Sequence, residues 1–266
     1  MEVVVLMLQT CSIHLNFDWG ASDDVHVKRF VLANLLSPFA VGLFANSHIL
    51  EGKATPYKSY RNYLWQNLDP LRTQRLPLKR IINNWSKAAL VETYAHFAAQ
   101  APLIYLRRLP HKKIDSKLAL NHWLQKPIMG LSPDEDDYRQ HLSLLFPNVR
   151  PKGYLELRMV DAPPTAWQMI PALFFSGLMY SEKTMNKALK LLVPFSSNLS
   201  QLDKQALHGL DYNAVFTPAQ KLITLSIEGL ESLPQSFRNT SQIQQLINFA
   251  ERYTFKQKVF ADSHQF

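Results

Sequence analysis

Two segments of the chain alternate hydrophobic and polar residues with the period of a β-strand. Hydrophobic residues occupy every second position of residues 10–19, and residues 154–161 alternate in the same way. This period is typical of a strand with one buried face. We therefore predict two strands, the first with Asn16 on its polar face and the second with Glu156 and Arg158 on a charged face.

Most of the remaining chain has hydrophobic residues at helical spacing. The first helix is expected over residues 25–44, with Ser22 or Asp23 as its N-cap and Pro38 as a possible kink. The other helical segments are 88–107 (a helix or a helix–strand unit), 117–124, 133–146, 166–180, 182–192, 217–232 and 241–260. Residues 133–137 form an acidic first turn, and residues 46–60 are a polar, turn-rich connection of the kind that often carries function. Strands followed by a helical remainder predict an α+β fold in a single domain, residues 1–266.

Composition narrows the class of protein. The chain has 266 residues, 47% of them hydrophobic, which excludes a disordered chain. A single cysteine excludes an intramolecular disulfide and favours the cytoplasm, and we expect Cys11 to pack in the core rather than act as a nucleophile. The apolar run 3–8 is too short for a secretory signal, and no stretch is long enough to span a membrane.

The net charge of +8 comes mainly from two basic clusters, which lie within residues 72–80 and 107–113. They are either solvated surface or regions that attract anions such as nucleotides, amino acids or nucleic-acid phosphates. Because no nucleic-acid-binding motif accompanies them, we do not expect a nucleic-acid partner. Glycine-rich phosphate loops, a nucleophile elbow and histidines at metal-ligand spacing are also missing from the sequence.

Three segments of the sequence concentrate polar residues in ways that core packing does not require. The polar face of residues 10–18 is either exposed surface or the floor of a binding site. A second patch covers residues 44–53 and continues through 59–61 and 65–73. In the third, Arg158 lies inside a strand and needs a partner, which is either Glu156 or a bound carboxylate or phosphate.

In this order, the three patches resemble the plant- and proteobacterial-type glutamate-cysteine ligases and their carboxylate-amine ligase relatives. The resemblance runs from about residue 10 to residue 192. The matching positions are Asn16, Asp18, Asn46, Ser47, Glu51, Gly52, Arg61, Asp69, Arg72, Thr73, Arg150, Glu156, Arg158 and Asp161.

The resemblance implies a glutamine-synthetase-like antiparallel sheet that forms a funnel, is packed by helices and precedes a helical C-terminal part. It implies an enzyme that uses ATP and Mg²⁺ to join the glutamate γ-carboxyl to the amine of cysteine, or of another small amine, through an acyl phosphate. By the same resemblance, Arg61 and Arg158 are candidate catalytic residues. The candidate substrate-binding residues are Asn16, Asn46, Glu51, Arg72 and Glu156.

The chain also departs from the family pattern. His14 stands where the family usually has glutamine. Family members carry an additional N-terminal segment with an E-x-E strand for magnesium and ATP, so the chain resembles the C-terminal two-thirds of the catalytic domain. An N-terminal partner polypeptide or a homo-oligomer is therefore a candidate assembly. Two alternatives stay open: a noncatalytic subunit or glutamate-binding remnant derived from a ligase, and an α+β domain whose polar patches are coincidental.

Overall fold

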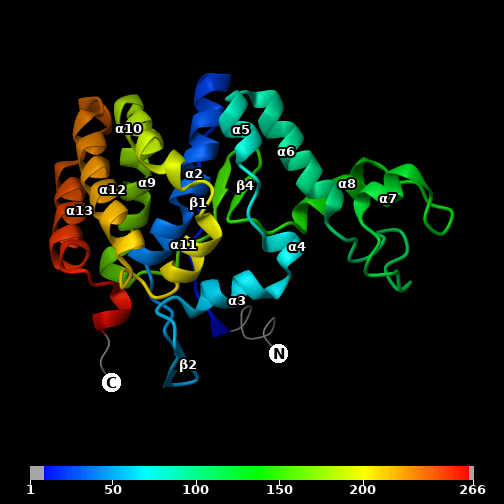
Figure 1. The fold of residues 1–266 in the computed structure, drawn as a ribbon, viewed down its shortest axis with the longest axis horizontal. Coiled ribbons are helices and arrows are strands. Elements are labelled where there is room, and N and C mark those ends of the chain that lie inside the picture. Colours follow the sequence, from blue (N-terminus) through cyan, green and yellow to red (C-terminus); the bar gives the residue numbers. More distant parts are fainter. Residues whose placement is uncertain (1–8, 264–266) are drawn as a thin grey trace.

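A computed structural model describes residues 9–263 as helices packed around a small antiparallel sheet (Figure 1). The sheet contains β1 (Leu15–Phe17), β5 (Leu155–Leu157) and β4 (Val149–Pro151), with β5 in the centre. A separate hairpin pairs β2 (Ile49–Leu50) with β3 (Lys53–Ala54). The predicted mixture of helices and antiparallel strands is confirmed at this level.

Both predicted strands exist but are shorter than the alternation indicated. Ser12 pairs with Asp161 in an isolated bridge that is one residue out of register with the Leu15–Leu157 pair. Because a register shift of one residue moves side chains to the opposite face, the alternation of β1 does not extend to Cys11. The prediction that Cys11 packs in the core is wrong, since this residue is exposed. The apolar run 3–8 lies outside the described residues.

Each predicted helical segment contains a helix, most of them with shifted ends, and further helices within residues 60–84 and 199–206 were not predicted. The longer helices are α2 (Asp23–Leu43), α3 (Tyr60–Leu68), α6 (Lys87–Gln100), α8 (Glu135–Ser143), α9 (Ile170–Met179), α10 (Glu182–Leu192), α11 (Leu199–Ala206), α12 (Asn213–Ser232) and α13 (Thr240–Arg252). The shorter α-helices are α4 (Pro70–Thr73), α5 (Lys79–Asn84) and α7 (Leu120–Gln125). Five 3₁₀ turns complete the described chain: η1 (Thr165–Trp167), η2 (Val193–Phe195), η3 (Gln235–Phe237), η4 (Thr254–Lys256) and η5 (Phe260–Ser263). No helix in residues 9–263 is both long and apolar enough to span a membrane.

Helix α2 is the central helix of the main core. Ser22 caps its N-terminus through the backbone N–H of Val25, and every residue from 29 to 43 is buried. Helices α6, α10, α11 and α12 all contact it. A helix that is covered all round is hydrophobic all round, which explains why α2 lacks a distinct polar face beyond its first two turns.

Helices α9 and α12 cross at unusually close range because each has a glycine at the crossing. A Cβ atom built on Gly229 would lie 1.8 Å from the backbone oxygen of Gly177, and one built on Gly177 would lie 2.0 Å from that of Ser226. Any side chain at either position would therefore force the helices apart. This crossing sets the spacing between α9 and α12.

Candidate functional site

The polar face of the three-stranded sheet gathers residues from all three strands. Asn16 of β1 and Arg150 of β4 both lie opposite Glu156 on the central strand. Two residues further along, Arg158 continues the same face of β5, whereas the alternate residues Leu155 and Leu157 are fully buried in the core. The period-two pattern thus places the candidate substrate-binding and catalytic groups on one surface.

Glu156 is the centre of a cluster of three cations. Its carboxylate accepts hydrogen bonds from Arg150 Nε at 2.7 Å, Lys152 Nζ at 3.0 Å and Arg158 Nη1 at 3.0 Å. Burial raises the pKa of Glu156, but these three hydrogen bonds outweigh it and bring the pKa down to about 2. Three cations around one carboxylate leave this part of the sheet with an excess of positive charge, as a site for anions requires.

Arg158 contacts two aromatic rings as well as Glu156. Its guanidinium carbon lies 5.0 Å from the ring centroid of Trp65 and 5.7 Å from that of Phe146. Its side chain is only 10% exposed, and Nε has no hydrogen-bond partner among the described residues. A guanidinium stacked on aromatic rings has a fixed plane, so its unused donor points in a defined direction.

Arg61 approaches the same aromatic platform from helix α3. Its Nη2 donates a 2.8 Å hydrogen bond to the backbone oxygen of Arg158, and its guanidinium carbon lies 5.7 Å from the Trp65 ring. Burial lowers the pKa of Arg61, and the nearby Asp161 carboxylate opposes that shift. Trp65 thus contacts both candidate catalytic arginines. No sequence pattern assigns Trp65 to the site, although it falls within the second polar patch.

Asp161 connects this region to the loop that precedes α3. Its carboxylate accepts hydrogen bonds from the backbone N–H of Asn46 at 3.1 Å and from the hydroxyls of Ser47 and Ser59 at 2.8 Å each. The side-chain amide of Asn62 donates to it at 3.2 Å. Burial raises the pKa of Asp161, and Arg61 together with these donors works against that rise. In the sequence, Asp161 is only a match to the family pattern, whereas in the structure its hydrogen bonds to Ser47 and Ser59 fix the start of α3.

Three predicted substrate-binding residues have other partners. Asn46 donates to the backbone oxygen of Ala162 at 2.8 Å. The buried Arg72 donates to the backbone oxygens of Leu144 and Pro102 and pairs with Asp69, which ties α4 to its surroundings. Glu51 is exposed at the tip of the β2–β3 hairpin, where its carboxylate accepts a hydrogen bond from Gln9. The structure therefore brings together Asn16, Glu156, Arg158 and Arg61, while Asn46, Arg72 and Glu51 have their partners outside this cluster.

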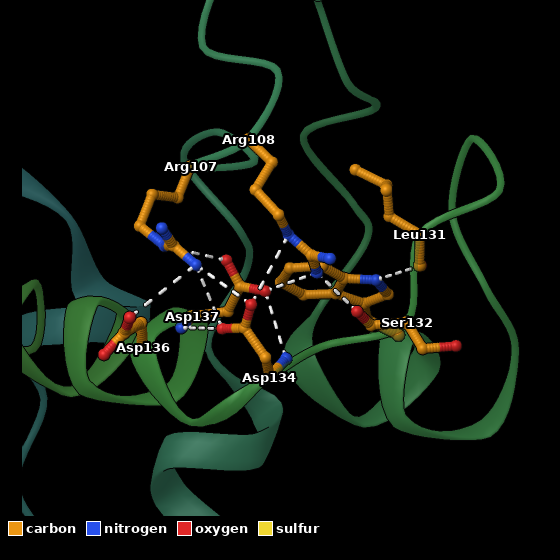
Figure 2. A network of polar contacts seen from close by, with 8 residues as sticks. Arg107, Arg108, Leu131, Ser132, Asp134, Asp136 and Asp137 are labelled. Carbon is orange, nitrogen blue, oxygen red and sulfur yellow. Dashed lines mark hydrogen bonds and ion pairs between the residues drawn. The ribbon is translucent and has the colours of Figure 1, made fainter.

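The second basic cluster is paired with the acidic helix start predicted for residues 133–137. Figure 2 shows Arg107 and Arg108 pointing toward the first turn of α8. Arg107 contacts Asp134 at 2.9 Å, and Arg108 contacts the buried carboxylate of Asp137 at 2.6 Å. Asp134 also caps α8 by accepting from the N–H of Asp137 at 2.8 Å. These arginines have internal partners, which favours a structural role over the capture of anions.

Residues 9–263 contain no group of three or more histidine, cysteine, aspartate or glutamate side chains placed to hold a metal ion. Glu156 and Asp161 are both fully engaged with cations and donors, so neither offers a free carboxylate for Mg²⁺. The described residues do not fit a magnesium site, and the expected use of Mg²⁺ and ATP stays a prediction.

A polar sheet face with paired arginines and surrounding helices is an arrangement suited to binding carboxylate or phosphoryl groups. The family described as glutamate-cysteine ligase family 2 matches residues 3–212. The chain belongs to this family.

Named plant proteins show the same relationship. The chain is 28% identical to a chloroplastic glutamate–cysteine ligase of Solanum lycopersicum over 253 residues, which cover 91% of this chain and 46% of that protein. It is 29% identical to the Nicotiana tabacum protein, over 85% of this chain and 44% of that one. It is 32% identical to the Arabidopsis thaliana protein, over 70% of this chain and 35% of that one. The chain spans less than half the length of these relatives. They are named chloroplastic, and the cytoplasmic location expected for this chain stays a prediction.

Proposed function

We propose that this chain acts in the ATP-dependent joining of the glutamate γ-carboxyl to the amine of cysteine, or of another small amine. The family membership and the names of the relatives support this reaction. The observation that carries the proposal is the fixed guanidinium of Arg158, which lies in an excess of positive charge beside the exposed Asn16. Such a group suits a substrate carboxylate or phosphoryl oxygen.

In the proposed reaction, the γ-carboxylate of glutamate attacks the terminal phosphoryl group of ATP and forms an acyl phosphate and ADP. The amine then attacks the acyl carbon, the new C–N bond forms, and the C–O bond to phosphate breaks. Negative charge develops on oxygen in both steps, and preorganised donors stabilise such charge without having to reorient. We assign this role to Arg158 and Arg61. No step is assigned to a metal ion.

The other residues of the cluster have supporting roles in this proposal. Glu156 holds Arg158 on the polar face through the 3.0 Å bond, and Asn16 offers an exposed amide to the substrate. We propose that this face forms the floor of the funnel that the family resemblance implies. Asn46 and Arg72 act from behind it, since they fix the segments that carry Arg61 and its neighbours.

The experiment that tests the proposal measures ADP release by the purified 266-residue chain with Mg²⁺, glutamate and cysteine, and with each substrate omitted. Release that requires both amino acids, together with detected γ-glutamylcysteine, supports a ligase. If ADP release fails but glutamate raises the melting temperature, the alternative of a noncatalytic glutamate-binding subunit is favoured, because a ligand that binds only the native state stabilises it. Absence of both effects contradicts a glutamate site in this chain.

A further inference from the structure

A cavity of about 660 Å³ lies along one side of helix α6, and we call it the α6 cavity. Its lining on this helix runs from Lys87 to Ala99 and includes Leu90, Val91 and Tyr94, which recur at intervals of three or four residues. Residues at this spacing form one stripe along a helix. Twelve residues of helix advance about 18 Å, so the cavity follows most of the length of α6.

The other walls of the α6 cavity are also largely apolar. They are formed by Trp19 and Pro151, by Leu120 and Leu124 of α7, and by Tyr138 and Leu142 of α8. Val91, Leu124 and Leu142 are 54%, 46% and 39% exposed, so large apolar side chains from three helices meet water at this cavity. Exposed apolar side chains that gather at one place are typical of a binding site, whereas scattered ones are not.

The charged groups of the α6 cavity lie at one end. Lys87 and His26 both belong to the lining, and both contact Asp23 Oδ1, which lies 2.8 Å from Lys87 Nζ and 3.3 Å from His26 Nδ1. The next acidic residue, Asp24, is paired with Lys28. A lysine ammonium has three N–H donors, so the pair with Asp23 leaves Lys87 able to bind a second acceptor. The cavity is therefore apolar along its length and offers a cation at one end.

We propose that the α6 cavity binds a single-chain amphipathic carboxylate of the fatty-acid type. The carboxylate contacts Lys87, and the hydrocarbon chain lies along α6 toward Ala99. Binding removes the apolar surface of the hydrocarbon and of the cavity from water, and the net charge of +8 attracts an anion to the protein. This binding does not depend on the ligase reaction proposed above.

Other classes of ligand fit this lining less well. A nucleotide base or a sugar needs several donors and acceptors around it, whereas this lining consists mainly of alanine, leucine and aromatic side chains. An alkylammonium ion suits the apolar walls but meets the like charge of Lys87 at the end of the cavity. The lysine side chain has an apolar stem and a charged tip, so it matches both parts of an amphipathic anion.

The first test measures the affinity of the wild-type chain for octanoate, decanoate and dodecanoate by calorimetric titration. Each buried methylene should raise the affinity about fourfold until the cavity is filled. Dodecylammonium has the same hydrocarbon chain with the opposite charge, and it should bind more weakly than dodecanoate. An affinity that does not rise with chain length, or equal binding of the two dodecyl ions, overturns the proposal.

Ala95→Phe should obstruct the middle of the cavity. Ala95 is exposed and lines the cavity eight residues beyond Lys87, which is about 12 Å along the helix. The ring should weaken dodecanoate binding by at least about tenfold, since it takes the place of several methylenes. Ala88→Phe is the matched control, because Ala88 is exposed on the same helix outside the lining. Both variants should keep the wild-type melting temperature, and the proposal is wrong if Ala95→Phe binds dodecanoate as tightly as Ala88→Phe does.

Lys87→Met tests the charged end and keeps an unbranched side chain. It should bind dodecanoate up to about fivefold more weakly, which is the contribution of a half-exposed ion pair, and should lose the preference for dodecanoate over dodecylammonium. Lys183→Met is the control, because Lys183 is exposed on α10 outside the lining. If Lys87→Met keeps the full preference, Lys87 does not bind the carboxylate.

Sedimentation velocity distinguishes this ligand from a second copy of the chain. If the wild-type chain dimerises and Ala95→Phe is monomeric, the apolar walls form an interface between copies, and the proposal fails. A wild-type chain that is monomeric and binds the longer carboxylates more tightly supports the α6 cavity as a ligand site.

Discussion

Glu156 is the central residue of β5 and Arg158 directly follows this strand, and the Arg158 guanidinium donates a 3.0 Å hydrogen bond to the Glu156 carboxylate. The sequence left open whether this arginine is paired with Glu156 or with a bound anion. The structure provides the first partner and still leaves the Nε donor of Arg158 unused within the described residues. Glu156 therefore orients the guanidinium without using all of its donors.

Replacing Arg158 with lysine should impair glutamate binding or turnover. A lysine keeps the charge but lacks the planar fork that stacks on Trp65 and Phe146. Hydrogen bonds to charged groups contribute about 1.5–3 kcal/mol, which corresponds to about a 10- to 150-fold loss in kcat/KM for glutamate. Steady-state kinetics with varied glutamate measures this loss, and urea denaturation should show a nearly unchanged fold.

The matched control is Arg139→Lys on α8, where an exposed arginine pairs with Glu135. Exposed pairs contribute little, so this variant should have wild-type kinetics. If Arg158→Lys has the wild-type kcat/KM, the assignment of Arg158 as a substrate-contacting residue is wrong.

Sequence patterns predicted the sheet face better than they predicted the site around it. The alternation placed Asn16, Glu156 and Arg158 on polar faces, because a strand's period of two requires only local information. Helix α10 was predicted from local information too, and its ends match the predicted residues 182–192. The acidic first turn of α8 was also confirmed, since helix capping is a local interaction.

Contacts between distant segments were not visible in the pattern. Helix α3 was not predicted, because its buried positions include Arg61 and Asn62 as well as Leu64 and therefore lack hydrophobic periodicity. The stacking of Trp65 on Arg158 joins residues that are far apart in the chain. Strand β4 has only three residues and includes Pro151, so no period can be recognised.

Glu156 predicts a pH dependence of stability. Its pKa falls from 4.5 to about 2 on folding, so its stabilising contribution is complete above pH 4.5 and is lost as the pH falls toward 2. Glu156→Gln should lower the free energy of unfolding at pH 7, by about 3 kcal/mol if the cluster behaves as a typical buried ion pair. The difference from wild type should shrink steadily in urea denaturation series between pH 5 and pH 2.

Glu135→Gln serves as the control, because Glu135 is 79% exposed and its pair with Arg139 is worth little. This variant should follow wild type over the whole pH range. A difference for Glu156→Gln that stays constant with pH would mean that the carboxylate is not stabilised by the surrounding cations.

At the crossing of α9 and α12, we expect replacement of glycine by alanine to lower stability, although helix propensity alone predicts an increase. Alanine normally stabilises a helix interior relative to glycine by about 1 kcal/mol. At Gly229, however, the added Cβ would lie 1.8 Å from the Gly177 backbone oxygen, which cannot move without shifting α9. Gly229→Ala should therefore destabilise the protein by about 1–3 kcal/mol or more, as overpacking does, measured by thermal or urea unfolding.

Gly153→Ala is the natural comparison, since a Cβ at that position meets no atom within 4 Å. Its melting temperature should stay close to that of wild type. Equal stability of Gly229→Ala and wild type would contradict the close crossing.

Substitutions of Trp65 test how much its ring contributes to positioning the two arginines, because the ring contacts both Arg158 and Arg61. Trp65→Phe keeps a ring, Trp65→Leu removes it, and both lose the indole N–H bond to the Phe146 backbone oxygen. The comparison between the two variants therefore isolates the cation–π contact, which is worth about 0.5–2 kcal/mol. Trp65→Leu should bind glutamate up to about 30-fold more weakly than Trp65→Phe in calorimetric titrations. Equal affinities in two folded variants would show that Glu156 and the backbone alone position the arginines.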